Sequence, residues 1–230
     1  MRRILQITAL IALGVLFAPA QDAERPTPAP SDKSKVQKKK SVDNRLTPAA
    51  ADIAEARKSG FEVFRLFPRG LYDMDANPFS VRGGGAYYSF AKKSHDYNEV
   101  PQIELQKGEI MVGFAGADYG LIADLGAVPL ASVDRENKSL EYLLDYRPAV
   151  EDPQARSEFL KIREGVTVDG LIYRRSLPVK IGHTYLLRSI NYDKADTLVA
   201  LSVARQDADG SLVIFWKLIE SFAVPVLKQG

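Results

Sequence analysis

The sequence predicts a mainly β fold, an antiparallel β-sandwich or open barrel with two or three short peripheral helices. Three observations lead to this prediction. Long apolar segments separated by turn residues fill the C-terminal third, shorter strand-like segments with glycine-rich separators fill the middle, and helical patterns are too few for repeated βαβ units. The chain has no cysteine, so packing alone must stabilise the fold.

The C-terminal third predicts three strands. Its apolar segments are rich in Val, Ile, Leu, Tyr and Phe, and they span His183–Ile190, Thr197–Arg205 and Ser211–Phe222. The separators, Asn191–Asp196 and Asp207–Gly210, consist largely of turn-forming residues. Because short turns join antiparallel neighbours, we expect these three strands to pair consecutively.

The middle of the chain predicts a three-stranded meander. The expected strands are Ile103–Leu105, Glu109–Phe114 and Leu121–Leu125. A Lys107-Gly108 turn separates the first two, and small residues at Ala115–Gly120 separate the last two.

Two further strands are expected nearer the N-terminus. Phe61–Phe67 alternates apolar and charged residues imperfectly, and Ala86–Phe90 is a short aromatic segment. Strand geometry places Tyr87 and Tyr88 on opposite faces of that segment.

A first helix is predicted at Ala49–Arg57, which is rich in alanine and followed by Gly60. We expect Thr47 to be its N-cap and Pro48 its first helical residue.

A clearer helical pattern runs from Gln154 to Glu164, with Asp152 as the expected N-cap and Pro153 at the first helical position. Asp134–Asp145 has leucines at helical spacing, but the run is short and its assignment stays ambiguous.

Residues 1–20 predict a secretory signal peptide. Arg2 and Arg3 precede the apolar run Ile4–Phe17, and Ala18-Pro19-Ala20 provides a small-x-small cleavage site before Gln21. The 14-residue apolar run is shorter than the roughly 20 residues that span a bilayer. We therefore expect a secreted or periplasmic protein with no transmembrane segment after cleavage.

Residues 21–46 predict a disordered linker rich in proline and lysine, and residues 47–230 a single β-rich globular domain. We interpret Lys38-Lys39-Lys40 as part of a solvated spacer, although the run could also contact an anionic surface.

Charge further restricts the possible partners. Removing Arg2 and Arg3 from 31 basic residues leaves 29, which equals the 29 acidic residues. The linker has seven basic and four acidic residues, so the globular domain has 22 and 25. A slightly acidic domain argues against nucleic acid as a partner.

Candidate catalytic residues are few. Ser94, His95 and Asp96 are the residue types of a hydrolytic triad, but sequence neighbours point apart, whereas a triad forms in space. We interpret the other histidine, His183, as a partly buried residue at a strand end. A non-standard hydrolase site would need His95, Asp96 and Asp118 to converge.

The candidate metal-binding and cofactor-binding motifs each lack residues that the complete motif requires. Asp73–Asn77 resembles the start of a calcium loop, but Pro78 and Gly84 occupy the places of the required glycine and glutamate. Asp207–Ser211 fails the same test, and Gly83–Gly85 lacks the spacing of a dinucleotide-binding loop. We therefore predict no metal and no cofactor.

An aromatic strand that runs into a basic loop is the candidate ligand surface. Its predicted residues are Tyr87, Tyr88, Lys92, Lys93, His95 and Tyr97. The competing interpretation is that these aromatic residues are core residues.

The leading hypothesis is an exported, non-enzymatic β-domain that binds a glycan, a peptide or an anionic polymer in the cell envelope or outside the cell. One alternative is an exported hydrolase with a site near His95, Asp96 and Asp118. The other is a structural envelope protein that assembles through an exposed strand edge or an apolar patch.

Overall fold

The structure is a computed structural model that describes residues 44–70, 84–114 and 118–228. The predicted signal peptide, residues 21–43 of the predicted linker and the Asp73–Asn77 segment lie outside these ranges. The last three linker residues, Asn44–Leu46, form the 3-10 helix η1. The Arg65 side chain donates a hydrogen bond to the carbonyl oxygen of Arg45, so this turn belongs to the folded body.

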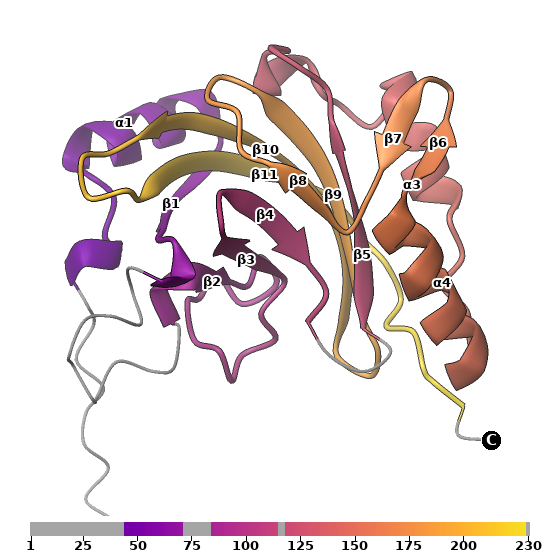
Figure 1. Cartoon of the computed structure of the whole chain (residues 1–230). Helices are drawn as coiled ribbons and strands as arrows, with labels where there is room; N and C mark the ends of the chain where they lie inside the picture. The colour runs from indigo at the N-terminus through magenta and orange to yellow at the C-terminus, as the bar shows by residue number, and fades with distance from the viewer. Residues whose placement is uncertain (1–43, 71–83, 115–117, 229–230) are drawn as a thin grey trace, which may run out of the picture. The chain divides into compact units, whose positions relative to one another are not determined.

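The larger sheet, sheet A, has five antiparallel strands in the order β1-β11-β10-β9-β5 (Figure 1). Its strands are β1 (Glu62–Leu66), β5 (Tyr119–Asp124), β9 (Thr184–Asn191), β10 (Ala195–Gln206) and β11 (Leu212–Ser221). Strands β9, β10 and β11 pair consecutively, as the turn residues between them predict.

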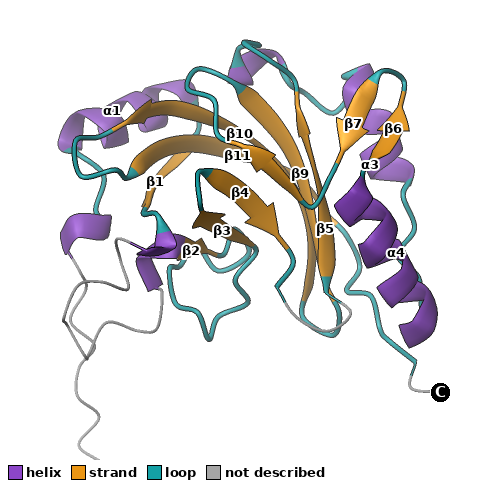
Figure 2. Ribbon diagram, viewed as in Figure 1, coloured by secondary structure: helices purple, strands orange, loops and turns teal. Residues whose placement is uncertain are grey.

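The smaller sheet, sheet B, has the order β2-β3-β4-β8 and is also antiparallel (Figure 2). Its strands are β2 (Tyr87–Tyr88), β3 (Ile103–Gln106), β4 (Glu109–Val112) and β8 (Ser176–Pro178).

A separate hairpin joins β6 (Val166–Val168) to β7 (Leu171–Tyr173). Asp169 and Gly170 both have positive φ in its two-residue turn, the conformation that matches strand twist.

The predicted meander is wrong in its third strand, because β5 pairs with β9 in sheet A and not with β4. Close packing where the chain crosses between the sheets explains the difference. A Cβ on Gly113 would lie 2.6 Å from the Cα of Tyr119, and a Cβ on Gly120 would overlap the side chain of Val112. In addition, five of the six β5 residues are buried, and sheet A has a core on both of its faces.

Three α-helices occur in the described ranges: α1 (Ala50–Ser59), α3 (Glu141–Asp145) and α4 (Asp152–Glu164). The remaining 3-10 turns are η2 (Gly84–Ala86), η3 (Leu130–Ser132) and η4 (Lys138–Leu140), so the ambiguous run Asp134–Asp145 contains η4 and α3.

Both predicted N-caps are wrong by one or two residues. Ala49 precedes α1 and Glu151 precedes α4, and neither accepts a side-chain capping bond. Asp152 lies inside α4 and pairs with Arg156, with Oδ2 2.6 Å from Nε. Gly60 ends α1 with a left-handed φ of 73°, as predicted.

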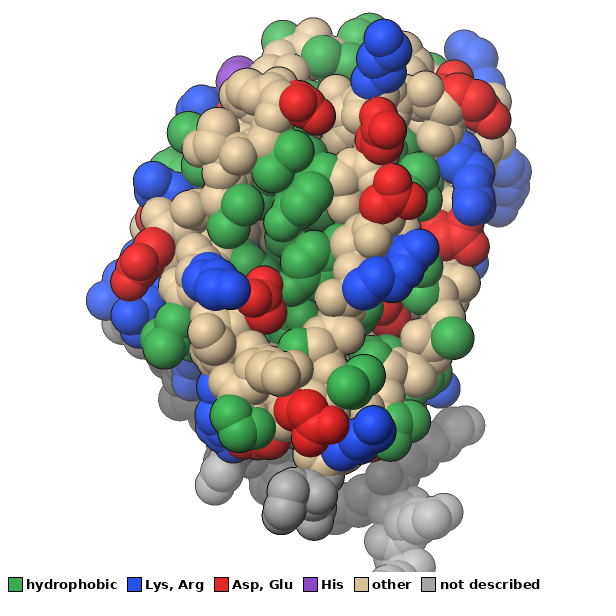
Figure 3. Space-filling model, turned by 90° about the vertical axis from the view of Figure 1, so that its right-hand side faces the viewer, with side chains coloured by type: hydrophobic (Ala, Val, Ile, Leu, Met, Phe, Trp, Pro, Cys, Tyr) green, Lys and Arg blue, Asp and Glu red, His purple; other side chains and the backbone are tan. Residues whose placement is uncertain are grey.

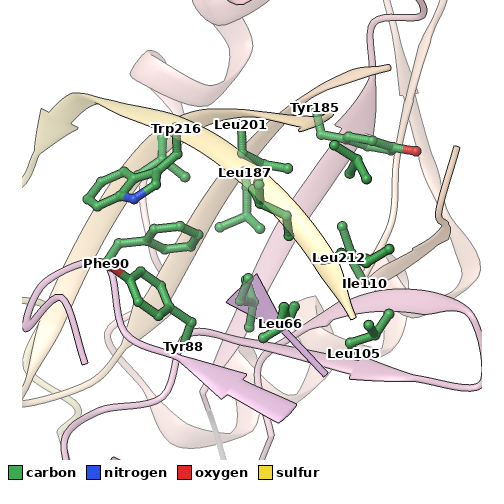
Figure 4. Close-up of a cluster of buried hydrophobic side chains, with 14 of the residues drawn as sticks. Leu66, Tyr88, Phe90, Leu105, Ile110, Tyr185, Leu187, Leu201, Leu212 and Trp216 are labelled. Atoms are coloured by element: carbon green, nitrogen blue, oxygen red, sulfur yellow. The ribbon is translucent and has the colours of Figure 1, made fainter. Parts of the chain in front are cut away.

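Sheet A separates two hydrophobic cores. In the inner core, between sheets A and B, Trp216, Leu201, Leu187 and Tyr185 from sheet A face Tyr88, Phe90, Leu105 and Ile110 (Figure 4). The outer core packs the other face of sheet A against α3, α4 and the β6-β7 hairpin. Ile122 of β5 forms an isolated bridge with Arg174, which lies between β7 and β8, and the N–H of Phe67, the residue after β1, donates to the carbonyl oxygen of Gly85 in η2. The described strands form no closed barrel.

An ion pair fixes the outer core. Arg188 donates from Nε and Nη2 to the Asp196 carboxylate at 2.8 and 2.7 Å, and both side chains are almost completely buried. Its Nη1 atom donates to the carbonyl oxygens of Leu143 and Tyr146, and its guanidinium lies 3.6 Å from the ring centre of Phe222. This one side chain therefore connects sheet A, α3 and the C-terminal segment.

The face that carries α4 and the hairpin has hydrophobic side chains in its middle and charged side chains around them (Figure 3). Leu160 of α4 and Ile172 of β7 are among the exposed large hydrophobic residues of these elements. No helix in the described ranges is long and apolar enough to span a membrane.

Candidate functional site

The face of sheet B that points away from sheet A carries a row of side chains of mixed polarity. Tyr87, Glu104, Met111 and Ser176 are successive cross-strand neighbours on β2, β3, β4 and β8. Cross-strand neighbours share a face of a sheet, and Ile103 of the same strands points to the inner core instead. The row is therefore not part of either hydrophobic core.

Glu104 is a buried carboxylate in this row. Its side chain is 5% exposed, and its Oε1 atom lies 3.0 Å from Nη1 of Arg69, whose side chain is 43% exposed. A buried charge is tolerated when a partner compensates it, so this ion pair places a polar group under the surface and a guanidinium at the surface.

Three aromatic rings gather beside the Arg69–Glu104 pair. The Tyr87 ring lies 4.9 Å from that of Tyr97 and 5.5 Å from that of Phe114, both in edge-to-face geometry. Tyr87 is buried, whereas Tyr97 is 41% exposed. Burial, followed by the adjacent Glu104 carboxylate, raises the pKa of Tyr87 to about 12, so its hydroxyl stays protonated and can donate to Glu104.

We call Tyr97, Tyr87, Arg69 and Glu104, with the loop of residues 91–100, the Tyr97 surface. The loop is held by its own hydrogen bonds: Ser89 and Ser94 exchange two backbone bonds, and Asp96 accepts from the backbone N–H of Asn98 at 3.1 Å. An Asx turn of this kind restricts the backbone on either side of Tyr97. The loop therefore holds the ring of the exposed residue Tyr97 against the buried ring of Tyr87.

The six predicted ligand-binding residues lie in three different environments. Tyr87 and Tyr97 belong to the outward face of sheet B. Tyr88 belongs to the inner core, where it stacks on Phe64 with ring centres 3.8 Å apart. The His95 ring lies 5.0 Å from that of Tyr88, and its Nδ1 atom is 2.7 Å from the carbonyl oxygen of Tyr87. The two lysines, Lys92 and Lys93, are exposed.

Lys93 is oriented by an ion pair across to sheet A. Its Nζ atom lies 2.5 Å from Oε1 of Glu62 in β1, and the backbone of Lys93 has a positive φ of 49°. Tyr87 and Tyr97 therefore lie at sheet B, whereas Lys93 is held toward sheet A. The predicted aromatic and basic residues do not form one continuous surface.

The structure does not bring the candidate hydrolase residues together. His95 lies 6.1 Å, between ring centres, from Phe64 of β1, whereas Asp118 precedes β5 and accepts from the Tyr192 N–H at 2.9 Å. Strands β1 and β5 are the opposite edges of sheet A, with three strands between them. Four strand spacings correspond to roughly 19 Å, far beyond hydrogen-bond reach.

A second polar cluster, which sequence reasoning missed, joins Asp124 to His183. The Asp124 carboxylate lies 2.9 Å from His183 Nδ1 and 2.9 Å from Lys180 Nζ, and it also accepts from the Gly126 N–H at 2.8 Å. Burial alone would raise the pKa of Asp124, but the hydrogen bonds from His183, Gly126 and Lys180 outweigh burial and lower it. His183 is partly buried just before β9, as expected from its position.

In the described ranges, no group of three His, Cys, Asp or Glu side chains is placed to hold a metal ion. At the β10-β11 turn, Asp207 and Asp209 lie 3.3 and 2.7 Å from Arg65 Nη2. Arg205 Nε also lies 2.7 Å from Asp207, so arginines occupy the positions that a cation would need.

Comparisons with family models, curated proteins and solved structures find no match to this chain.

Proposed function

We propose that the chain is an exported, non-enzymatic binding domain whose ligand docks on the Tyr97 surface. One observation carries the proposal: Tyr97, a residue that is 41% exposed, contacts a buried aromatic ring edge-to-face, beside an ion pair between a buried carboxylate and a partly exposed guanidinium. Binding sites combine such apolar contact with a few fixed polar groups. Export rests on the signal-peptide pattern of residues 1–20.

A binding role fits this arrangement better than a hydrolytic one. Acid-base catalysis needs its groups within hydrogen-bond reach of one reacting atom, and His95 and Asp118 lie at opposite edges of sheet A. The Asp124–His183 pair has suitable geometry for orienting an imidazole, but its third partner is the Lys180 ammonium and not a nucleophile.

Strand addition at sheet B is less favoured as the basis of a structural role, because the edges of this sheet are short. Its edge strands are β2, with two residues, and β8, with three. Main-chain recognition gains affinity with each added backbone hydrogen bond, so edges of this length provide little.

The test is to map where a ligand binds on the mature chain, Gln21–Gly230. The ¹⁵N-labelled protein is titrated separately with chitohexaose, polyphosphate and an unstructured Gly/Ser-rich peptide, and backbone amide shifts are followed. We expect at least one probe to shift amides around Tyr97, Tyr87, Glu104 and Arg69 and to be recovered chemically unchanged.

Two results would overturn the proposal. One is the absence of shifts with every probe. The other is a set of shifts centred on Asp124 and His183, particularly together with cleavage of the probe, which would indicate an enzyme with its site at the start of β9.

A further inference from the structure

We infer that the ligand of the Tyr97 surface is an uncharged glycan, with a sugar ring stacked on the exposed face of Tyr97. This inference rests on the proposed function and adds the chemical class of the ligand to it.

The charges of the surface balance. It holds three cationic side chains, Arg69, Lys92 and Lys93, and three anionic side chains, Asp96, Glu99 and Glu104. Two of the cations form ion pairs, Arg69 with Glu104 at 3.0 Å and Lys93 with Glu62 at 2.5 Å. A polyanion is recognised through uncompensated positive charge and the release of counterions, so this surface is poorly suited to one.

The exposed ring suits the apolar face of a sugar. Tyr97 contacts the buried Tyr87 ring edge-to-face at 4.9 Å, which fixes its plane while 41% of the residue remains exposed. A rigid aromatic side chain supplies contact area at a low cost in conformational entropy. The C–H groups of a pyranose ring can cover such a face without any charge on the ligand.

The neighbouring polar groups suit sugar hydroxyls. The Arg69 guanidinium pairs with Glu104, and the side-chain amide of Asn98, next to Tyr97, is oriented by Asp96 at 3.2 Å. Hydroxyl groups both donate and accept, and fixed donors and acceptors beside an aromatic ring can bind them without a net charge. A peptide, in contrast, would need a longer strand edge or an apolar groove.

The experiment measures affinities of the mature chain for chitohexaose, cellohexaose, polyphosphate and the Gly/Ser-rich peptide by isothermal titration calorimetry. We expect a neutral oligosaccharide to bind, with an affinity that changes less than about twofold between roughly 50 and 300 mM salt. We expect Tyr97→Ala to weaken this binding about tenfold or more, and Tyr97→Phe to keep it within about threefold, because the ring remains.

Two matched variants separate the ring from charge and from general surface effects. Lys58→Gln removes an exposed charge on α1, outside the Tyr97 surface, and should leave neutral-glycan binding within about twofold. Ile172→Ala removes a comparably exposed apolar side chain on β7 and should also have no effect. Thermal unfolding of every variant confirms that folding is unchanged.

The outcomes separate the two proposals. If polyphosphate or the peptide binds with dependence on Tyr97 while neither neutral oligosaccharide binds, the glycan inference is wrong and the binding function stands. If a neutral oligosaccharide binds equally well to wild type and Tyr97→Ala, the inference is wrong as well. If no probe binds at millimolar concentration, both proposals are rejected.

Discussion

Arg188 and Asp196 form a doubly hydrogen-bonded ion pair that is almost fully buried in the outer core. The free energy of this pair depends on both partners being present, because an uncompensated buried charge is costly whereas a buried apolar pair is not. The Arg188 guanidinium also donates to two carbonyl oxygens from the α3 region, so the pair connects secondary structure as well as charge.

We predict that Asp196→Ala lowers the free energy of unfolding by about 3–5 kcal/mol, because it leaves Arg188 buried and uncompensated. The double variant Arg188→Met, Asp196→Leu should lose clearly less than the single variant. Urea unfolding followed by circular dichroism measures both. A double variant at least as destabilised as Asp196→Ala would contradict this account of the pair.

A second prediction concerns the crossing between the sheets. A Cβ on Gly120 would overlap Val112 and lie 2.7 Å from the carbonyl oxygen of Arg188. We expect Gly120→Ala to cost about 1–3 kcal/mol or more through overpacking, and Val112→Ala in the same chain to recover part of the loss. Gly70→Ala is the control, since no atom of the described residues lies within 4 Å of the position that its methyl group would take, and it should be nearly neutral.

The Asp124 cluster predicts a pH dependence of stability. The pKa of Asp124 is lower in the folded chain than its ordinary value near 3.8, so its contribution is complete above that value. It is lost as the pH falls through the lower, folded pKa. Denaturant unfolding between pH 6 and 2 should therefore show a smaller acid loss for Asp124→Asn than for wild type.

Asp52 and Asp209 also have lowered pKa values. The free energy of unfolding of Asp124→Asn should therefore still fall at acidic pH, but less steeply than that of wild type. Parallel curves for wild type and Asp124→Asn would show that the hydrogen bonds of Asp124 do not favour its charged form.

The signal-peptide hypothesis predicts a defined mature N-terminus. Expression of the full chain in a secreting bacterium should release a protein that begins at Gln21, because Ala18 and Ala20 fit the small-residue positions of the cleavage site. Ala20→Phe should retain the precursor. Intact-mass analysis of the exported and cell-bound fractions measures both, and a product that starts at Met1 in the exported fraction would contradict the hypothesis.

Sequence reasoning succeeded where the deciding information is local. The Asp207–Gly210 turn lies between two apolar segments, and β10 and β11 pair across it. Gly60 ends α1 because its left-handed φ of 73° is accessible to glycine at little cost. Helix starts were less accurate, since Thr47 and Pro48 permit a start that the chain delays to Ala50.

The errors and omissions involve residues that meet only in three dimensions. β5 follows β4 closely in sequence but pairs with β9 in sheet A, which has a hydrophobic core on each of its faces. Glu104 and Arg69 are separated by 35 residues, and no spacing pattern relates them. An isolated glutamate in the apolar run Ile103–Leu105 is the one local signal that could have indicated a polar group on the outward face of sheet B.

The pairing of β1 with β11 has a consequence for how the polypeptide acquires its structure. The first and last of the described strands are neighbours, with Glu62 opposite Trp216 and Leu66 opposite Leu212. Closing contacts across so much intervening chain is slow, and it cannot begin before the C-terminal residues have emerged from the ribosome. A nascent chain in this state lacks one edge of its principal sheet, and the sheet stays incomplete until synthesis is nearly finished.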